Sequence, residues 1–497
     1  MAGGDTVWVL GDQLNRSLGA LKGRRPGEVH VLLVESAAKL ASKPWHRQRA
    51  HLVLASMRRF AAELRGAGFT VDHRREPSLE EGLEAHRREH GPQRVLAMEP
   101  ASAPGLALLQ RLGVETVRSD QFLCHYEDFA AWAARRPSLR MEDFYRDQRR
   151  RLGYLMDGDQ PAGGRWNFDH DNREPPPRDG GAWPRPPRSR LDGLDAAVLA
   201  DLPDTCWGDP PDGTWPTSRR QALARLRHAV ENVLPRFGPH EDAMVATSWH
   251  LAHTLLSSSL NLGLLTPGEV CDAVEVAYRQ GRVPIASAEG FIRQVIGWRE
   301  YVWGCYWLWR EDFRTGNGLE ATSPLPVLFT GGPTRMRCVS HAMTAVREHG
   351  WTHHIHRLMI FGNLCLLTGI EPMQVNDWMW SSFVDGAEWV MLPNVVGMAL
   401  HADGGRMMTK PYAAGGAYID RMSDYCGECP YDRRRRTGDD ACPFTTLYWD
   451  FMARHADRLR GNHRMAQQVR AVHALRDITE VRERAVTIRA GLEAGTV

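Results

Sequence analysis

The pattern of apolar residues changes along this chain, and that change constrains its fold more than any other feature. From residue 5 to about residue 120, short apolar segments alternate with amphipathic helical patterns, whereas from about residue 220 onwards nearly every segment has helical periodicity. Alternating strands and helices imply an open parallel sheet. The sequence therefore predicts an N-terminal α/β domain with a Rossmann-like parallel sheet, followed by an all-helical C-terminal domain.

A connector rich in proline, glycine and arginine separates the two patterns. Residues 126–173 have a basic, helical pattern that ends in GGRWNFDHDNR, and PPP, PRPPRSR and DPPDGTWP follow as far as about residue 217. Such a composition is typical of extended linkers. We expect an α/β domain over residues 1–130, a helical and Pro/Gly/Arg-rich linker over 131–219, and a helical domain over 220–497.

The bulk properties exclude several classes of protein. The 497 residues suffice for two or three domains, and the net charge of +2 argues against a strong polyanion binder overall. No segment approaches the roughly 18 apolar residues that a membrane span needs, and the first residues lack the basic and apolar regions of a signal peptide. We expect a cytoplasmic, monomeric protein that does not bind membranes.

Acidic residues follow the predicted strands at their carboxyl ends, where open parallel sheets bind their ligands. These residues are Asp12, Glu35, Glu99 and Asp120. There is no GxGxxG motif, and carboxylates at this edge would repel a pyrophosphate. The pattern favours a neutral ring or polyol as ligand, and the alternative is that these acids are solvated loop residues.

Four cysteines in the C-terminal third form the strongest motif. Cys426 and Cys429 are two residues apart, Cys442 follows after twelve residues, and Cys338 is available as a fourth ligand. Proline follows two of these cysteines, as at many iron–sulphur ligands. The spacing favours an iron–sulphur cluster, but it leaves open a structural zinc site that uses His341.

Two further segments contain residues suited to chemistry. Trp298-Arg299-Glu300 lies on a predicted buried helix, where an Arg–Glu pair is either a core ion pair or part of a binding site. His353 and His354 lie close to Arg357, and such a histidine pair can bind a metal, donate a proton or pack in a core. A metalloprotease is disfavoured because the glutamate of HExxH is missing.

Together and in this order, eight segments resemble the photolyase/cryptochrome family, and most closely its iron–sulphur bacterial members, the prokaryotic (6-4) photolyases. The resemblance covers nearly the whole chain and implies the photolyase/cryptochrome fold. The segments are LGDQL, SMRRFAAELR, GGRWNFD, EGFIRQVIGWREY, HHIHRLM, PNVVGM, TKPYAAGGAYIDRMSDYC and CPFTTLYWDF.

The resemblance implies that the helical domain binds FAD, and it supplies a set of flavin residues. The residues that match the family's flavin site are His253, Thr254, Ser257, Arg299, Arg357 and Asn394. We expect Glu388 to support Arg357 as its partner in this site.

The same resemblance assigns roles around the flavin. His354, with His353, would deliver a proton during repair of a (6-4) lesion, and Trp298 would line the lesion pocket. Damaged DNA is the implied partner, and the lesion must leave the duplex to reach the flavin. Arg149 to Arg151 and Arg433 to Arg436 are the expected contacts to DNA phosphates, and the alternative is that they form solvated surface runs.

Two more cofactors are implied. Asp12 and Glu35 would bind a 6,7-dimethyl-8-ribityllumazine antenna, a polyol-bearing ring without phosphate, and the four cysteines would hold a [4Fe–4S] cluster that staples the helical domain. Trp378, with Tyr412 and Tyr418, would carry electrons to the flavin. Three residues differ from those of close relatives at the same positions, namely Thr330, Met379 and Met391. These differences put the usual route of electrons to the flavin in doubt, and Trp380 would act as a substitute on that route.

Three functions are compatible with these features. The first is light-driven repair of (6-4) photoproducts by reduced FAD. The second is a blue-light cryptochrome photoreceptor that binds the same cofactors and signals without repairing DNA. The third is a zinc-stabilised nucleic-acid-binding module without redox chemistry, which a colourless preparation of the protein would favour. The histidine pair favours repair.

Overall fold

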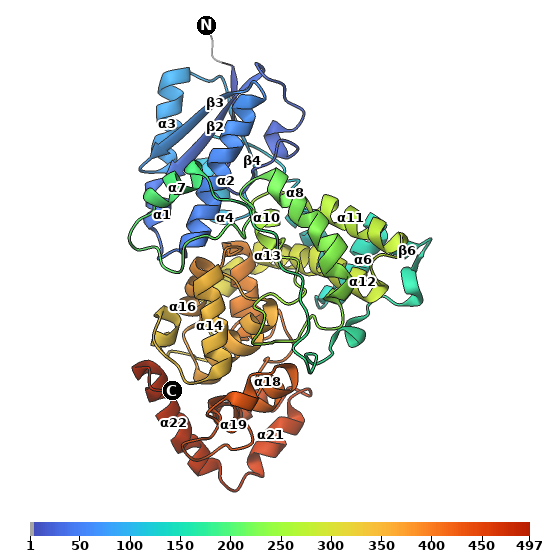
Figure 1. The fold of residues 1–497 in the computed structure, drawn as a ribbon, viewed down its shortest axis with the longest axis vertical. Coiled ribbons are helices and arrows are strands. Elements are labelled where there is room, and N and C mark those ends of the chain that lie inside the picture. The colour runs from blue at the N-terminus through green and yellow to red at the C-terminus, as the bar shows by residue number, and fades with distance from the viewer. Residues whose placement is uncertain (1–3) are drawn as a thin grey trace.

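Five parallel strands form the sheet of the N-terminal domain, as Figure 1 shows at the top of the computed structural model. The structure describes residues 4–497. The N-terminal segment is expected to lack a signal peptide, and its first three residues lie outside the described range. The strand order is β3-β2-β1-β4-β5. The predicted parallel sheet is confirmed, and its strands are β1 Asp5–Trp8, β2 Val29–Ser36, β3 Thr70–Glu76, β4 Val95–Met98 and β5 Glu115–Val117.

Helices cover both faces of this sheet. On β1 and β2, successive side chains point to opposite faces, so that Val7, Val31 and Leu33 join the main core with α2 (Arg47–Gly66). Trp8, Leu32 and Val34 pack on the opposite face, in a separate core with Leu83 of α3 (Leu79–His90) and Leu109 of α4 (Ala103–Arg111). The strand order reverses at β1 and β4, which places the carboxyl ends of these two strands at the expected ligand edge.

The C-terminal part is helical, which confirms the predicted fold class. The capping box of Thr266 and Glu269, with Pro267 at the first position, starts α11 as its sequence predicts. The principal helices are α8 Arg219–His228, α11 Pro267–Arg279, α12 Ile285–Ile292, α13 Glu300–Thr315, α14 Arg337–His349, α15 Asn363–Thr368, α16 Pro372–Ser382, α17 Glu388–Leu392, α18 Gly416–Met422, α19 Pro443–Arg454 and α22 Ile478–Ala494.

Among the π-helical segments of the chain, which also include η4 (Ala229–Val233) after α8, three carry predicted flavin residues. They are η5 (Arg293–Arg299), η7 (His356–Gly362) and η8 (Pro393–Ala399). Each carries one of the predicted flavin residues, namely Arg299, Arg357 and Asn394 in that order. Wide helical turns of this kind occur most often at functional sites, because the extra residue re-aims the side chains around it.

The connector leaves the helical part and returns to the α/β domain, where Figure 1 shows it in green. Its short helix α7 (Gly193–Ala200) packs against α2. Asp195 anchors the contact, since its carboxylate bonds His51 at 3.0 Å and Arg59 at 2.7 Å. The connector therefore ties the two parts of the chain together. In the described part of the chain, no helix combines the length and apolarity needed to cross a bilayer.

Candidate functional site

Three of the predicted histidines meet in the helical part. The His253 and His353 rings stack with their centroids 4.7 Å apart, and the His354 ring lies edge-on to His253 at 5.7 Å. His353 is buried, and neither of its ring nitrogens has a hydrogen-bond partner. His354 is half exposed, and its Nε2 lies 3.1 Å from Oδ1 of Asp242.

The two neighbouring histidines have opposite protonation tendencies. Burial lowers the pKa of His353 well below its ordinary value, and the other histidines around it act in the same direction. Burial also opposes the charged form of His354, but the hydrogen bond and charge of Asp242 outweigh it and raise the pKa. His354 is therefore suited to hold a proton beside a neutral His353.

A second group joins Ser257, Arg357 and Asp385. The Ser257 hydroxyl donates to Oδ2 of Asp385 at 2.7 Å, and Arg357 donates through Nη1 to Oδ1 at 3.0 Å. Arg357 also donates through Nε to the Thr352 carbonyl at 2.8 Å. The prediction that Glu388 supports Arg357 is wrong, because Glu388 pairs with Arg314 at 3.1 Å and Asp385 takes its place.

Buried polar atoms without partners surround these two groups. They are His253 Nε2, the hydroxyls of Ser258, Ser259 and Thr352, and both ring nitrogens of His353. A buried polar group without a partner costs about 1–3 kcal/mol, so a concentration of them indicates a ligand-binding region. The donor set suits a polar cofactor such as FAD, whose phosphates and ring offer many acceptors.

Arg299 is connected to the Asp385 group through Gln121 and Asn261, whose amide donates to the Asp385 carbonyl at 2.9 Å, whereas Asn394 is not. The Arg299 side chain is 9% exposed, pairs with Glu300 at 3.0 Å and lies over Phe122 at 4.1 Å. It donates to the Gln121 carbonyl, and the Gln121 amide reaches the Asn261 carbonyl at 3.2 Å. The Asn394 amide donates to the Val390 carbonyl within its own helix at 2.7 Å. Among the described residues, no hydrogen bond links Asn394 to the other predicted flavin residues.

The aromatic residues predicted to carry electrons or line the lesion pocket are all at least partly buried. The Trp378 indole donates to the Phe329 carbonyl at 2.7 Å. Burial raises the pKa of Tyr412, and it raises that of Tyr418 to about 12, so both phenols stay protonated. Trp298 lies edge-on to Tyr301 at 6.2 Å. These roles stay predictions.

All four predicted cysteines line one small cavity, together with Tyr425 and Tyr431. Burial raises the pKa of Cys338, and the charges of the other three cysteines add to the shift. Burial also raises the pKa of Cys426 to about 12, with the charges of Cys442, Asp420 and Cys429 acting in the same direction. Four thiolates would repel one another here unless a cation stood among them, so the donor set fits a metal centre. His341, the alternative zinc ligand, does not line this cavity.

Among the acids at the sheet edge, Glu35 is not a solvated loop residue, whereas Asp120 is 35% exposed and pairs with Lys22. Glu35 is 8% exposed, and Arg58 donates to both its oxygens at 2.8 Å. Burial opposes its ionisation, but the hydrogen bonds of Arg58 and His73 outweigh it and lower its pKa to about 2. Burial raises the pKa of Asp12. Glu35 is thus an ionised internal anchor, and any antenna would have to share its oxygens with Arg58.

The basic runs divide into buried and exposed members. Arg149 is fully buried and donates to the carbonyls of Trp166 at 2.8 Å and Leu155 at 2.5 Å. It cannot contact DNA, so this part of the prediction is wrong. Arg150 is 54% exposed. The second run is largely paired, because ion pairs hold Arg433, Arg435 and Arg436 to Asp420, Asp440 and Asp477 respectively.

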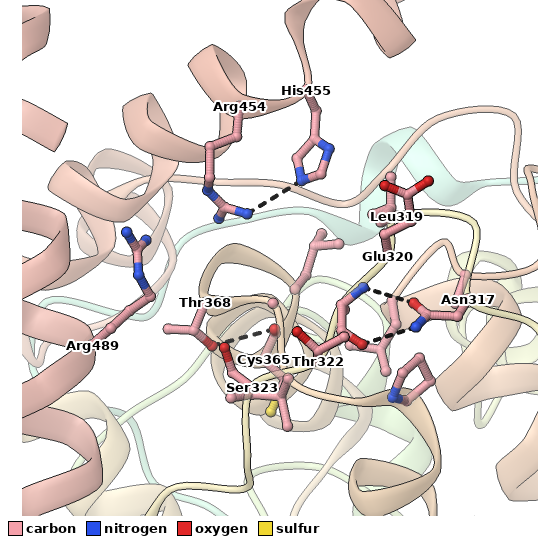
Figure 2. Close-up of a pocket in the computed structure, with 17 residues that line it drawn as sticks. Asn317, Leu319, Glu320, Thr322, Ser323, Cys365, Thr368, Arg454, His455 and Arg489 are labelled. Carbon is pink, nitrogen blue, oxygen red and sulfur yellow. Dashed lines mark hydrogen bonds between the residues drawn. The ribbon is translucent and has the colours of Figure 1, made fainter.

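Two cavities lie outside the predicted set. One of about 680 Å³ lies between the connector and residues 247–250, and Trp183, Arg185, Arg188 and Trp249 line it. The Trp183 ring lies edge-on to that of His240, with the ring centroids 5.7 Å apart, and none of the predicted site residues lines this cavity. Figure 2 shows the other, of about 210 Å³, where Arg454, His455 and Arg489 face Asn317 and Ser323; it contains none of the predicted site residues.

Sequence reasoning missed the acidic partners of the site. Asp385 binds both Ser257 and Arg357, and Asp242 binds His354. Burial raises the pKa of Glu241, next to Asp242, to about 7. Asp385 lies three residues before the glutamate that was chosen instead, and spacing alone could not separate the two. For Asp242, no local signal distinguished it from other surface acids.

Comparisons with known proteins agree with the predicted family and fold. A family model described as deoxyribodipyrimidine photo-lyase-related protein matches residues 7–209. The chain is 41% identical over 478 residues to a (6-4) photolyase of Agrobacterium fabrum, which covers 93% of this chain and 94% of the relative. A bacterial class III photolyase from Agrobacterium tumefaciens matches the fold over 99% of this chain and 98% of its own, with a TM-score of 0.61 and 16% identity. A Synechocystis cryptochrome matches over 80% and 83%, with a TM-score of 0.53 and 16% identity.

Proposed function

Because the chain belongs to the photolyase/cryptochrome family, beside the bacterial (6-4) photolyases, we propose that it repairs (6-4) photoproducts in UV-damaged DNA by light-driven electron transfer. The observation that carries this proposal is the histidine pair. Asp242 raises the pKa of His354 and so favours its protonated form, next to the buried, partnerless polar atoms of His353 and His253. A photoreceptor needs the flavin site but has no need of a proton donor beside it.

The residues around Asp385 fit FAD, which the family implies. Ser257 and Thr254, with the partnerless hydroxyls of Ser258 and Ser259, would hold the cofactor. When bound in its reduced form, FAD supplies under illumination the electron that opens the lesion. Asp385 keeps Arg357 and Ser257 in fixed positions, and its negative charge compensates the guanidinium in this poorly hydrated site.

His354 would donate a proton to the photoproduct through Nε2. Asp242 orients the imidazole and favours its charged form, while the stacked His253 and His353 exclude water on the other side. The connector cavity is lined by tryptophans and arginines, a composition that binds unpaired nucleotides, so it would contact the DNA strand beside a lesion turned out of the duplex.

The metal centre that we propose for the four cysteines is a [4Fe–4S] cluster. The support is the donor set itself: four thiols line one cavity to which His341 does not contribute. The cluster would join α14, the segment of Cys426 and Cys429, and the start of α19. It would thereby hold the C-terminal helices to the rest of the domain. Iron and acid-labile sulphide in about fourfold molar amount would agree with this assignment.

We propose lumazine as the antenna at Asp12 and Glu35, at the carboxyl ends of β1 and β2. The support is the lack of a phosphate-binding motif at this edge. Mass spectrometry of the ligands released from purified protein tests it, and a phosphate-bearing pterin or flavin in place of lumazine would contradict it.

The decisive experiment for the function incubates the reduced protein with an oligonucleotide that contains one (6-4) photoproduct, in blue light and in darkness. We expect intact thymines only in the light, and His354→Gln should abolish their recovery while the flavin stays bound. If the native protein binds the lesion but restores no thymines in light, the repair function is wrong and a photoreceptor remains.

A further inference from the structure

A buried polar cluster lies under the C-terminal end of α3, far in sequence from both the flavin residues and the cysteines. The first half of α3 packs on apolar side chains of β2, and Gly82 lets the helix approach so closely that a Cβ there would lie 2.4 Å from Val34. The second half covers polar residues of the same sheet face. These are Thr6, His30 and Asp72 from the strands, and His86 and His90 from the helix.

The ligand atoms of this cluster have the spacing of a metal site. His86 and His90 are four residues apart and share one helix face. Nδ1 of His86 lies 2.7 Å from Oδ2 of Asp72, and Nε2 of His90 lies 3.4 Å from the same oxygen. Two ligands of a tetrahedral zinc ion with bonds of about 2.0 Å are about 3.3 Å apart. The three ligand atoms all lie within 4.8 Å of one another.

The charges around the cluster favour a cation. Burial opposes ionisation of Asp72, but the hydrogen bonds of His86 and Arg74 outweigh it and lower its pKa. Burial lowers the pKa of His86, which favours the neutral imidazole that binds a metal. The carboxylates of Asp72 and Glu89 face the single guanidinium of Arg74, whose Nε lies 2.6 Å from Oδ2 of Asp72, the oxygen that would bind the metal. The C-terminal end of α3 adds a further negative potential.

We propose that Asp72, His86 and His90 form a zinc-binding site in the N-terminal domain, independent of the flavin and of the cysteine cavity. Zinc would replace the proton in the hydrogen bond between His86 and Asp72. Water or His30 would be the fourth ligand, because the centroid of the His30 ring lies 5.1 Å from that of His90. Nε2 of His86 lies 2.8 Å from the Thr6 hydroxyl, which would orient the ring as ligand. Histidine and carboxylate together suit Zn²⁺.

The test measures zinc and iron in the purified full-length protein, with its cofactors, after equilibrium dialysis against micromolar zinc. We expect His90→Gln, which alters a partly exposed ligand, to bind one zinc less per chain than the native protein, with affinity lowered at least about tenfold. Asp72→Asn should have the same effect. His170→Gln, at a fully exposed histidine outside the cluster, is the control and should bind as much zinc as the native protein.

X-ray absorption at the zinc edge separates this site from zinc that has displaced iron. We expect nitrogen and oxygen neighbours at about 2.0–2.1 Å and no sulphur near 2.3 Å. Native protein and both cluster variants binding equal zinc would overturn the proposal, as would a sulphur shell. Zinc should also raise the melting temperature of the native protein and not of Asp72→Asn, which keeps the proposal testable if His90→Gln folds poorly.

Discussion

Asparagine in place of Asp385 tests the core of the flavin site. Asp385 is 8% exposed on its side chain and binds Ser257 through one bond and Arg357 through two, at 2.7, 3.0 and 3.2 Å. Asp385→Asn removes the charge and turns an amide towards the guanidinium. Arg357 is 20% exposed and keeps only its bond to the Thr352 carbonyl, so its charge is left largely uncompensated.

The size of the effect follows from this burial. Breaking a buried pair by removing one partner costs about 3–5 kcal/mol, and the partial exposure of Arg357 favours the lower value, about 3 kcal/mol. At about 2–4 °C per kcal/mol for a domain of this size, the melting temperature of the helical part should fall by roughly 6–12 °C. The flavin content of the purified variant should fall with it, because Ser257 loses its partner.

Glu388→Gln is the matched control. Glu388 pairs with Arg314, whose side chain is 46% exposed and stays hydrated when the pair is lost. Glu388 itself is 7% exposed, but glutamine leaves no charge in its place and the cation that it releases stays in water, so we expect a loss of about 0–1 kcal/mol and a shift of the melting temperature of less than about 4 °C. Circular dichroism at rising temperature measures both variants. If Glu388→Gln destabilises the protein as much as Asp385→Asn, the assignment of Asp385 as the partner of Arg357 is wrong.

Three other substitutions test separate parts of the structure. Asp242→Asn should lower the raised pKa of His354, so that the alkaline fall of the repair rate moves to lower pH; a pH–rate profile measures this. Cys429→Ser should lower the soluble yield and the iron content before it affects repair by the remaining folded protein. Arg149→Met should destabilise the protein by at least about 3 kcal/mol, because buried carbonyls lose their donor, whereas Arg150→Met should change stability by less than about 0.5 kcal/mol.

Further measurements and a control check the predictions for Asp242→Asn and Cys429→Ser. The pKa of His354 is raised in the folded state, so its contribution to stability is complete below pH 6.5 and is lost as pH rises through the raised pKa; Asp242→Asn should remove that slope. Cys206→Ser, at an isolated cysteine, should keep its iron. Soluble, flavin-loaded Cys429→Ser protein without a cluster would contradict the structural role of the cysteines.

Local patterns in the sequence predicted the elements of this fold well. The five strands, the start of α11 at Thr266 and the grouping of four cysteines all depend on periodicity, capping chemistry or short spacing, which act over few residues. The burial of Arg149 can also be predicted from the sequence. It follows Tyr145 by four residues and Met141 by eight, and thus lies on the buried face of its helix.

Contacts between distant segments could not be predicted in the same way. Arg357 and Asp385 are 28 residues apart, with the whole of α16 between them, and the path of the chain after Ser382 decides which of two nearby acids faces the arginine. The pairing of His354 with Asp242 spans 112 residues. The sequence supplies residues of the right chemistry, but only tertiary packing selects among them.

The adjacent histidines show why this selection matters for the chemistry. His353 and His354 are the same residue type in the same segment, and their ordinary pKa is the same. Stacking against His253 in a buried position makes His353 neutral, whereas one carboxylate at 3.1 Å makes His354 basic. A proton can then move from the half-exposed ring to a substrate without a second positive charge in the core. We therefore predict that Asp242, more than either histidine alone, decides which of the two acts as the acid.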